Sequence, residues 1–211
     1  MKKFEIEAKE ILKEVDCFFP KEFAGKESIL WLHKYSNNKK QDEWAGFFFE
    51  DFCFQILSKF LGGWKGPRIT KSARFDYQRH FVWDFKMHSN KNKWALLNDK
   101  AKTDQTVEEN SGIGYIIAKA DFSYDNSGVL KQWRNKMEGR TTQGHKLKSN
   151  GKITSIFAVF LTKSDIELGV RDGWIKDYNQ GRNSGVGAAA RKVKYQIDVE
   201  GIPQKFIIER D

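Results

Sequence analysis

Apolar residues near the start of the chain recur every three to four positions, which is the spacing of one helix face. This first helix carries Phe4, Ala8, Ile11, Leu12, Val15 and Phe19. Pro20, which has no backbone N–H, marks its end. A second helix is expected over residues 22–35. A third begins with Asp42 as its N-cap residue and ends at Gly62 and Gly63, and its many apolar residues predict nearly complete burial.

Beyond residue 63 the pattern alternates between apolar and polar positions, which is typical of strands. Strands are predicted at residues 73–78, 81–88, 114–120 and 153–161, and helices at residues 98–110 and 128–138. A turn near Arg79 and His80 joins the first two strands. The other two strands are continuous apolar runs, as expected in the middle of a sheet that is covered on both faces. Residues 193–209 are typical of a hairpin that turns at Glu200 and Gly201.

These elements predict an α/β fold in which helices flank a mixed central sheet and a β-hairpin ends the chain. The length of 211 residues, without a repeat or a low-complexity linker, favours a single domain over residues 1–211. Within it we distinguish an N-terminal helical segment at residues 1–41, a core at residues 42–161 and a C-terminal region at residues 162–211.

The charge of the chain points to a class of partner. It has 37 Lys plus Arg against 28 Asp plus Glu, and the formal charge of +9 favours a polyanion such as nucleic acid or an anionic membrane surface. The sequence shows no apolar run of membrane-spanning length and no signal peptide, so we expect a cytoplasmic protein without a membrane partner. The two cysteines and four histidines lack the spacing of a zinc site.

The strand predicted at residues 81–88 carries polar residues at alternate positions of an aromatic segment. Alternate side chains of a strand share a face, so Asp84, Lys86 and His88 point away from the face that holds Trp83. An ion pair on a half-exposed strand would explain these residues without any function and would contribute at most about 1 kcal/mol. The surrounding aromatic residues favour burial instead, where unpaired charges are costly.

If the two strands form a hairpin, Phe75 and Tyr77 share the apolar side and Asp76 lies beside Asp84 on the polar side. Two such carboxylates repel each other unless a divalent cation neutralises both, and oxygen-only ligands favour Mg²⁺. Lys86 on the same face can orient a water near a phosphate or help to deprotonate it. This is the chemistry of phosphodiester hydrolysis.

Asp76 and the D-F-K triplet at residues 84–86, on a hairpin after a long helix, resemble the signature of the PD-(D/E)xK nucleases. The order of elements over residues 42–161 is similar to the restriction-endonuclease-like αβββαβ core of that superfamily. This chain departs from the pattern where Phe75 replaces the usual proline and where only seven residues separate the two aspartates. The resemblance implies a type II restriction endonuclease that cuts double-stranded DNA with Mg²⁺, for which Mn²⁺ can substitute.

The resemblance also implies roles for individual residues. The catalytic set is Asp76, Asp84, Lys86 and Glu50, of which the three carboxylates would hold the metal. Glu50 is the closest counterpart of a glutamate that many members carry on the preceding helix, and Glu43 is the reserve candidate. A compact subunit with one active site implies a homodimer on a symmetric target, and a restriction system can include a companion DNA methyltransferase.

The glycine-rich segment before the C-terminal hairpin is expected to contact DNA. Side chains suited to base edges are Gln180, Arg182 and Asn183, and those suited to phosphates are Arg191, Lys192 and Lys194. His88 is a further candidate for a phosphate contact. Two other functions remain open: a repair or recombination nuclease with the same chemistry, and a non-catalytic nucleic-acid-binding protein in which the acidic residues are structural.

Overall fold

The computed structural model describes residues 2–65, 75–141, 146–181 and 191–210. Its α-helices are α1 (Lys3–Phe18), α2 (Gly25–Tyr35), α3 (Trp44–Phe60), α4 (Lys100–Asn110), α5 (Val129–Glu138) and α6 (Lys163–Asp172). Its strands are β1 (Glu22–Ala24), β2 (Tyr77–Gln78), β3 (Val82–Ser89), β4 (Trp94–Asp99), β5 (Ile113–Tyr124), β6 (Lys148–Leu161), β7 (Ile175–Tyr178), β8 (Lys194–Asp198) and β9 (Ile207–Ile208), with a 3₁₀ turn at Gln204–Phe206.

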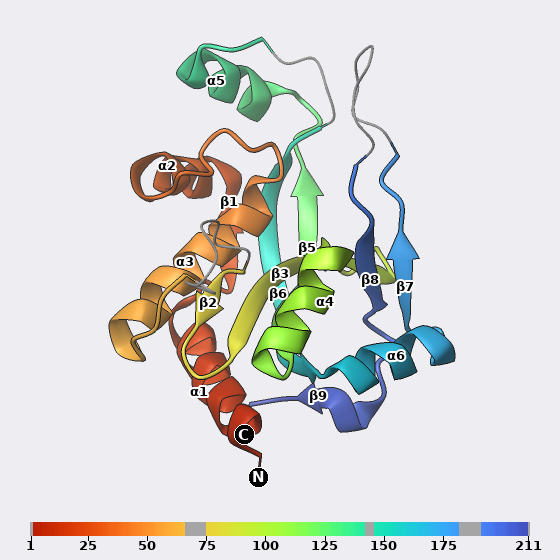
Figure 1. Cartoon of the computed structure of the whole chain (residues 1–211). Coiled ribbons are helices and arrows are strands. Elements are labelled where there is room, and N and C mark those ends of the chain that lie inside the picture. The colour runs from red at the N-terminus through yellow and green to blue at the C-terminus, as the bar shows by residue number, and fades with distance from the viewer. Residues whose placement is uncertain (1, 66–74, 142–145, 182–190, 211) are drawn as a thin grey trace.

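The strands form two sheets. The main sheet has the order β1-β6-β5-β3-β2, with β9 on β6, and the smaller sheet has the order β4-β8-β7. Strands β3 and β5 are parallel, whereas the other neighbours in the main sheet are antiparallel. The chain between β3 and β5 runs through β4 and α4, a crossover that parallel neighbours require (Figure 1). The fold is therefore α/β with a mixed central sheet, as predicted.

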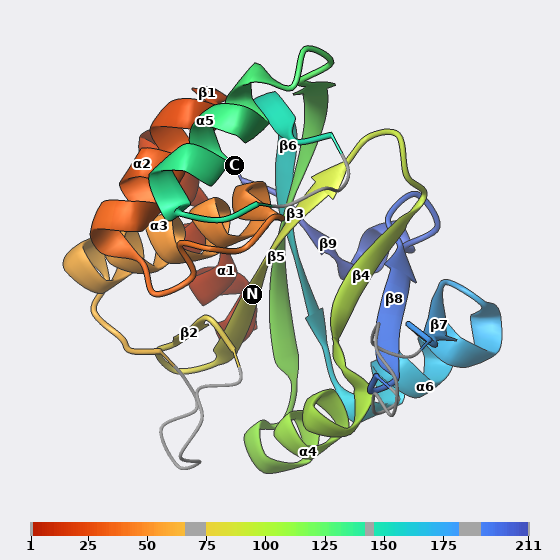
Figure 2. The ribbon, with the colours of Figure 1, turned by 90° about the horizontal axis from the view of Figure 1, so that it is seen from above.

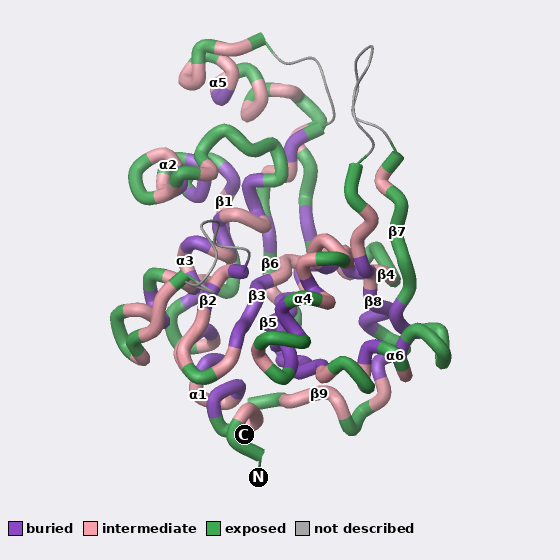
Figure 3. The backbone as a smooth tube through the Cα atoms, in the orientation of Figure 1, coloured by how far each residue is buried: buried purple, intermediate pink, exposed green. Residues whose placement is uncertain are grey.

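Each face of the main sheet has its own hydrophobic core. Helices α1, α2 and α3 cover one face, and the smaller sheet lies on the other side together with α4 (Figure 2). Along β5, Ile116 packs into the first core while Tyr115 and Ile117 pack into the second. Both faces are thus buried along the middle of the central strands (Figure 3). This double burial explains the continuous apolar runs in the sequence.

Several predicted boundaries need correction. Residues 22–35 are not one helix, because Glu22–Ala24 form β1 on the edge of β6, with Phe23 opposite Gly151. The N-cap of α3 is Glu43 rather than Asp42, whose carboxylate instead accepts a hydrogen bond from Arg140 at 2.9 Å.

The helix expected at residues 98–110 begins only at Lys100. The six residues Trp94–Asp99 before it form β4, a strand that the sequence pattern missed because its alternation is short. The strand expected at residues 73–78 is reduced to Tyr77–Gln78, and residues 73–74 lie outside the described part of the chain.

The predicted C-terminal hairpin is wrong. Strand β8 pairs with β4 and β7 in the smaller sheet, whereas β9 pairs with β6 in the main sheet. Between them the chain turns through Pro203, which has no N–H to donate to a ladder, into the 3₁₀ turn. The sequence pattern also missed helix α6 and strand β7, and β7 is one of the two strands that pair with β8.

Both cysteines are free; Cys53 is buried in the first core and Cys17 is exposed. None of the helices in the described ranges combines the length and the apolar composition that a membrane crossing requires.

Candidate active site

Strand β3 places Asp84 and Lys86 between the main sheet and the smaller sheet. The apolar residues Trp83 and Phe85 point into the first core, so Asp84 and Lys86 share the opposite face, as predicted. The Asp84 side chain is 3 % exposed, and its Oδ2 forms an ion pair with the Lys86 Nζ. Its Oδ1 accepts a hydrogen bond from the Asn98 Nδ2 at 2.7 Å. The ion pair is thus real but buried, which excludes the half-exposed pair considered from the sequence.

Asp76 reaches the same strand through its side chain. Strand β2 pairs with β3 only at Val82 and Trp83. Beyond this short ladder, the Asp76 Oδ2 accepts a hydrogen bond from the backbone N–H of Phe85 at 2.8 Å. The carboxylate therefore satisfies a backbone group that a longer β2 would have paired.

The packing of the residues around Asp76 differs from the prediction. Phe75 and Tyr77 do not share an apolar side, since Phe75 belongs to the second core and Tyr77 to the first. The reason is that the chain bends at residues 75–76 and becomes a strand only at Tyr77, so the alternation of a regular strand does not extend back to Phe75.

Helix α3 contributes Glu50, which is partly buried. Burial raises the pKa of Glu50 to about 7, with Lys86 opposing this shift and Asp84 adding to it. Glu43, the reserve candidate, lies at the N-terminal end of α3 with a side chain that is 78 % exposed, and it pairs with Lys148 at 2.5 Å. Of the two glutamates, Glu50 is the one that the fold brings into the electrostatic field of Asp84 and Lys86.

Burial and mutual repulsion disfavour the charged forms of the carboxyl groups in this cluster. Burial raises the pKa of Asp76 well above its ordinary value, and the carboxylates of Asp84 and Glu50 add to the shift. Burial opposes the charge of Lys86, but the surrounding carboxylates outweigh it and raise the pKa of this lysine. Raised carboxyl pKa values are the expected sign of acidic groups that lack sufficient countercharge.

These residues fit a hard divalent cation in the chemistry of their donor atoms, because all three acidic side chains supply oxygen. Among the residues described, however, no three or more His, Cys, Asp or Glu side chains are already arranged as metal ligands. The Lys86 ammonium holds Asp84 Oδ2, so a cation bound there would take over part of that contact.

The glutamate on α3 gives a testable prediction. We expect Glu50→Gln to lower the affinity of the site for Mg²⁺ or the rate of cleavage, because one oxygen ligand loses its charge.

The same substitution should also change the stability of the metal-free protein. The folded-state pKa of Glu50 lies above the ordinary value, so ionising Glu50 at pH 8 disfavours folding. The metal-free variant should therefore unfold at a higher temperature than the unmodified protein at pH 8. Thermal unfolding and Mg²⁺ titration check both effects; Glu43→Gln is the matched control, and an equal response of both variants would contradict the assignment.

The segment predicted to contact DNA links β7 and β8. Gln180 lies just after β7, Arg191 and Lys192 are exposed before β8, and Arg182 and Asn183 lie outside the described residues. Lys194, at the start of β8, is half-buried and faces the acidic cluster: burial lowers its pKa, and the charge of Lys86 lowers it further.

His88 has a different environment from the one expected. It is only 5 % exposed, and its Nε2 donates a hydrogen bond to the backbone carbonyl of Asn92 at 2.8 Å. Burial lowers the pKa of this imidazole. The ring thus stabilises the turn between β3 and β4, and its contact with DNA stays a prediction.

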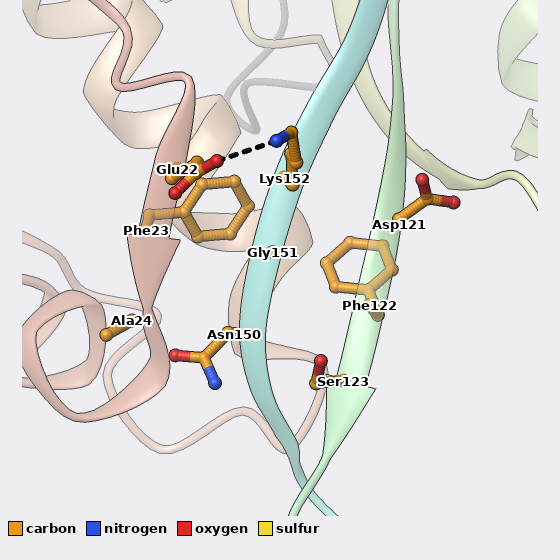
Figure 4. A pocket seen from close by; sticks show the side chains of 9 residues that line it. All are labelled: Glu22, Phe23, Ala24, Asp121, Phe122, Ser123, Asn150, Gly151 and Lys152. Carbon is orange, nitrogen blue, oxygen red and sulfur yellow. Dashed lines mark ion pairs between the residues drawn. The ribbon is translucent and has the colours of Figure 1, made fainter.

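A pocket of about 550 Å³ lies apart from this cluster. It is lined by residues of β1, β5 and β6 such as Phe23, Phe122 and Lys152, and the Glu22–Lys152 ion pair of 2.9 Å crosses its edge (Figure 4). None of the predicted site residues lines it. This pocket is therefore separate from the acidic cluster.

Sequence reasoning missed Asn98. This residue ends the apolar stretch of β4, and no local pattern links it to Asp84, which is 14 positions away. A scan against models of protein families and searches of curated proteins and of solved structures give no match for this chain.

Proposed function

We propose that the protein is a Mg²⁺-dependent endonuclease that cuts double-stranded DNA, in the manner of a type II restriction enzyme. The observation that carries this proposal is the convergence around Lys86 of Glu50 from α3, Asp76 from the bend before β2 and Asp84 from β3. Burying three acidic side chains and a lysine costs folding free energy, and such clusters of perturbed groups are typical of functional sites.

Each side chain has a chemical role in this proposal. Asp84, Asp76 and Glu50 would hold the Mg²⁺, which when bound supplies charge stabilisation to a phosphate under attack. Lys86 remains an ammonium among the carboxylates, so it can donate hydrogen bonds to a phosphate oxygen and orient the attacking water. Asn98 donates a hydrogen bond to Asp84 and the N–H of Phe85 donates one to Asp76, and these bonds restrain the two carboxylates.

The rest of the molecule is compatible with a duplex substrate. Strands β7 and β8 are antiparallel, and the end at which the chain leaves β7 and enters β8 lies toward the end of the molecule where α5 lies, on the other side of the main sheet (Figures 1 and 2). The charge of +9 favours binding of the polyanion. In the same proposal two chains form a homodimer so that both strands are cut, Mn²⁺ can replace Mg²⁺, and a companion methyltransferase protects the host DNA.

The experiment that tests the function is incubation of the protein with phage DNA and Mg²⁺, with and without EDTA. Discrete fragments that disappear with EDTA support a sequence-specific endonuclease. A Mg²⁺-dependent smear or nicking would favour a repair or recombination nuclease with the same site. Binding without any cleavage, unaffected by EDTA, would overturn the proposal in favour of a nucleic-acid-binding protein.

The base of the β7–β8 connection gives a prediction on binding. We expect Lys192→Ala to weaken binding to all duplexes and to reduce the slope of log K against log[salt] by about one, since one phosphate contact releases about one counterion. Lys163→Ala is a matched control, because both lysines are exposed and each pairs with a carboxylate. Lys192 pairs with Asp99 at 3.6 Å, and Lys163 pairs with Glu108 at 3.0 Å. Fluorescence anisotropy over a salt series checks this, and equal slopes for the two variants would remove Lys192 from the interface.

A further inference from the structure

Strand β4 contains one residue more than the strand it pairs with. Its Leu96 lies opposite Gln196 and its Asp99 opposite Lys194, so three steps along β4 correspond to two steps along β8. This irregularity is a β-bulge, and Asn98 lies within it. Bulges bend a strand and redirect side chains, and they are common next to active sites.

The bulge directs Asn98 out of its own sheet. Leu97 beside it is buried in the second core, whereas the Asn98 amide reaches the main sheet and donates its hydrogen bond to Asp84. Asp84 lies on β3, which is not a neighbour of β4 in either sheet. This contact is therefore a side-chain bridge between the two sheets rather than a product of strand pairing.

The two oxygens of Asp84 have different partners. Oδ1 accepts from Asn98 at 2.7 Å, and Oδ2 is paired with Lys86. Fixing one oxygen stops rotation of the carboxylate about its last bond and so determines where the other oxygen points. The donor is also neutral: a lysine or arginine there would repel a divalent cation, and an aspartate would have no proton to donate.

We propose that Asn98 is a positioning residue that holds the Asp84 carboxylate in the orientation needed to bind the divalent cation. This inference rests on the proposed nuclease function. Outer partners that orient a metal-binding carboxylate typically contribute about 10- to 100-fold to metal affinity or activity. Asn98 acts through Asp84, so we expect it to affect the cation and the rate of cleavage but not the binding of DNA.

The test compares Asn98→Ala, Asn98→His and Asn90→Ala. Asn90 is a matched control, because its Nδ2 also donates to an aspartate, Asp121, at 2.9 Å. A histidine at position 98 carries a ring N–H at about the reach of the asparagine amide and can restore the contact. The measurements are the rate of nicking of a supercoiled plasmid with Mg²⁺, its kcat and KM, and the binding of Mn²⁺ alone by calorimetry.

We expect Asn98→Ala to lower kcat and the Mn²⁺ affinity by about 10- to 100-fold with KM unchanged, and Asn98→His to recover a substantial part of both. Asn90→Ala should match the unmodified protein. If the unmodified protein cuts DNA and Asn98→Ala equals Asn90→Ala in rate and in Mn²⁺ binding, the positioning role is wrong while the nuclease function stands. If the unmodified protein does not cut, both proposals fail. If Asn98→Ala does not fold, Asn98→His is the deciding variant. A folded Asn98→His protein that binds Mn²⁺ normally supports the positioning role, and a folded Asn98→His protein that does not bind Mn²⁺ overturns it.

Discussion

We expect Asp84→Asn to abolish the proposed Mg²⁺-dependent cleavage of DNA while the fold and DNA binding are retained. The amide has nearly the same shape as the carboxylate, so the packing of a side chain that is 3 % exposed changes little. It loses the negative charge that would hold the cation and that pairs with Lys86. Loss of several kcal/mol of charge stabilisation at the phosphate corresponds to a rate at least about 1000-fold lower. Nicking assays over a Mg²⁺ series, together with anisotropy for DNA binding, measure both effects.

A second buried aspartate provides the control. Asp198 on β8 is 9 % exposed in its side chain and pairs with Lys93 at 3.0 Å, so like Asp84 it is a buried aspartate paired with a lysine, although Lys93 is more exposed than Lys86. Asp198→Asn should therefore carry a similar cost in stability without loss of cleavage. If both variants lose activity in parallel with their thermal stability, the effect at Asp84 is structural, and the active-site assignment is wrong.

We expect Glu7→Ala to lower the free energy of unfolding by about 3 kcal/mol, because it removes a buried acceptor that four donors share. Glu7 on α1 is 3 % exposed. Its carboxylate accepts from the Trp83 Nε1 at 2.8 Å, from the His80 Nδ1 at 2.7 Å and from the backbone N–H groups of His80 and Phe81 at 3.2 Å. Glu7 thus stabilises the turn between β2 and β3, which precedes Asp84 in the chain. Urea unfolding followed by tryptophan fluorescence measures the loss.

The neighbouring glutamate on α1 serves for comparison. Glu10 also pairs with the β2–β3 turn, through Arg79, but its side chain is 44 % exposed. We expect Glu10→Ala to cost less than about 1 kcal/mol, as for other exposed ion pairs. Equal losses for the two variants would show that the buried contacts of Glu7 contribute no more than a surface pair does.

The sequence predicted those parts of the fold that depend on local pattern. Helices α1 and α3 and strands β5 and β6 have strong periodicity or long apolar runs, because α1, α3 and β5 pack against a core along most of their length and β6 does so at its C-terminal end. The same alternation predicted that Asp84 and Lys86 share one face of β3, and the structure confirms this placement. Their catalytic roles stay predictions.

What the sequence did not predict depends on partners far along the chain. A hairpin was expected at the C-terminus because a glycine lies between two short apolar runs, but β8 and β9 each bind a distant strand instead. Glu7 looks like a surface residue of an amphipathic helix, and only the packing of α1 against the β2–β3 turn makes it a buried acceptor. Asn98 depends on a bulge in β4 that has no sequence signature.

The short ladder between β2 and β3 has a consequence for solubility. Past Trp83, β3 runs along the margin of the main sheet without a strand partner on that side in the described residues. Such margins expose backbone groups that can pair with a strand of another molecule and start aggregation. The Asp76 side chain accepts a hydrogen bond from the N–H of Phe85 on this margin, so this N–H is not open to a strand of another molecule. We therefore expect Asp76 to protect this part of the sheet from edge-to-edge association, so that Asp76→Ala, which frees the Phe85 N–H, makes the protein more prone to aggregate.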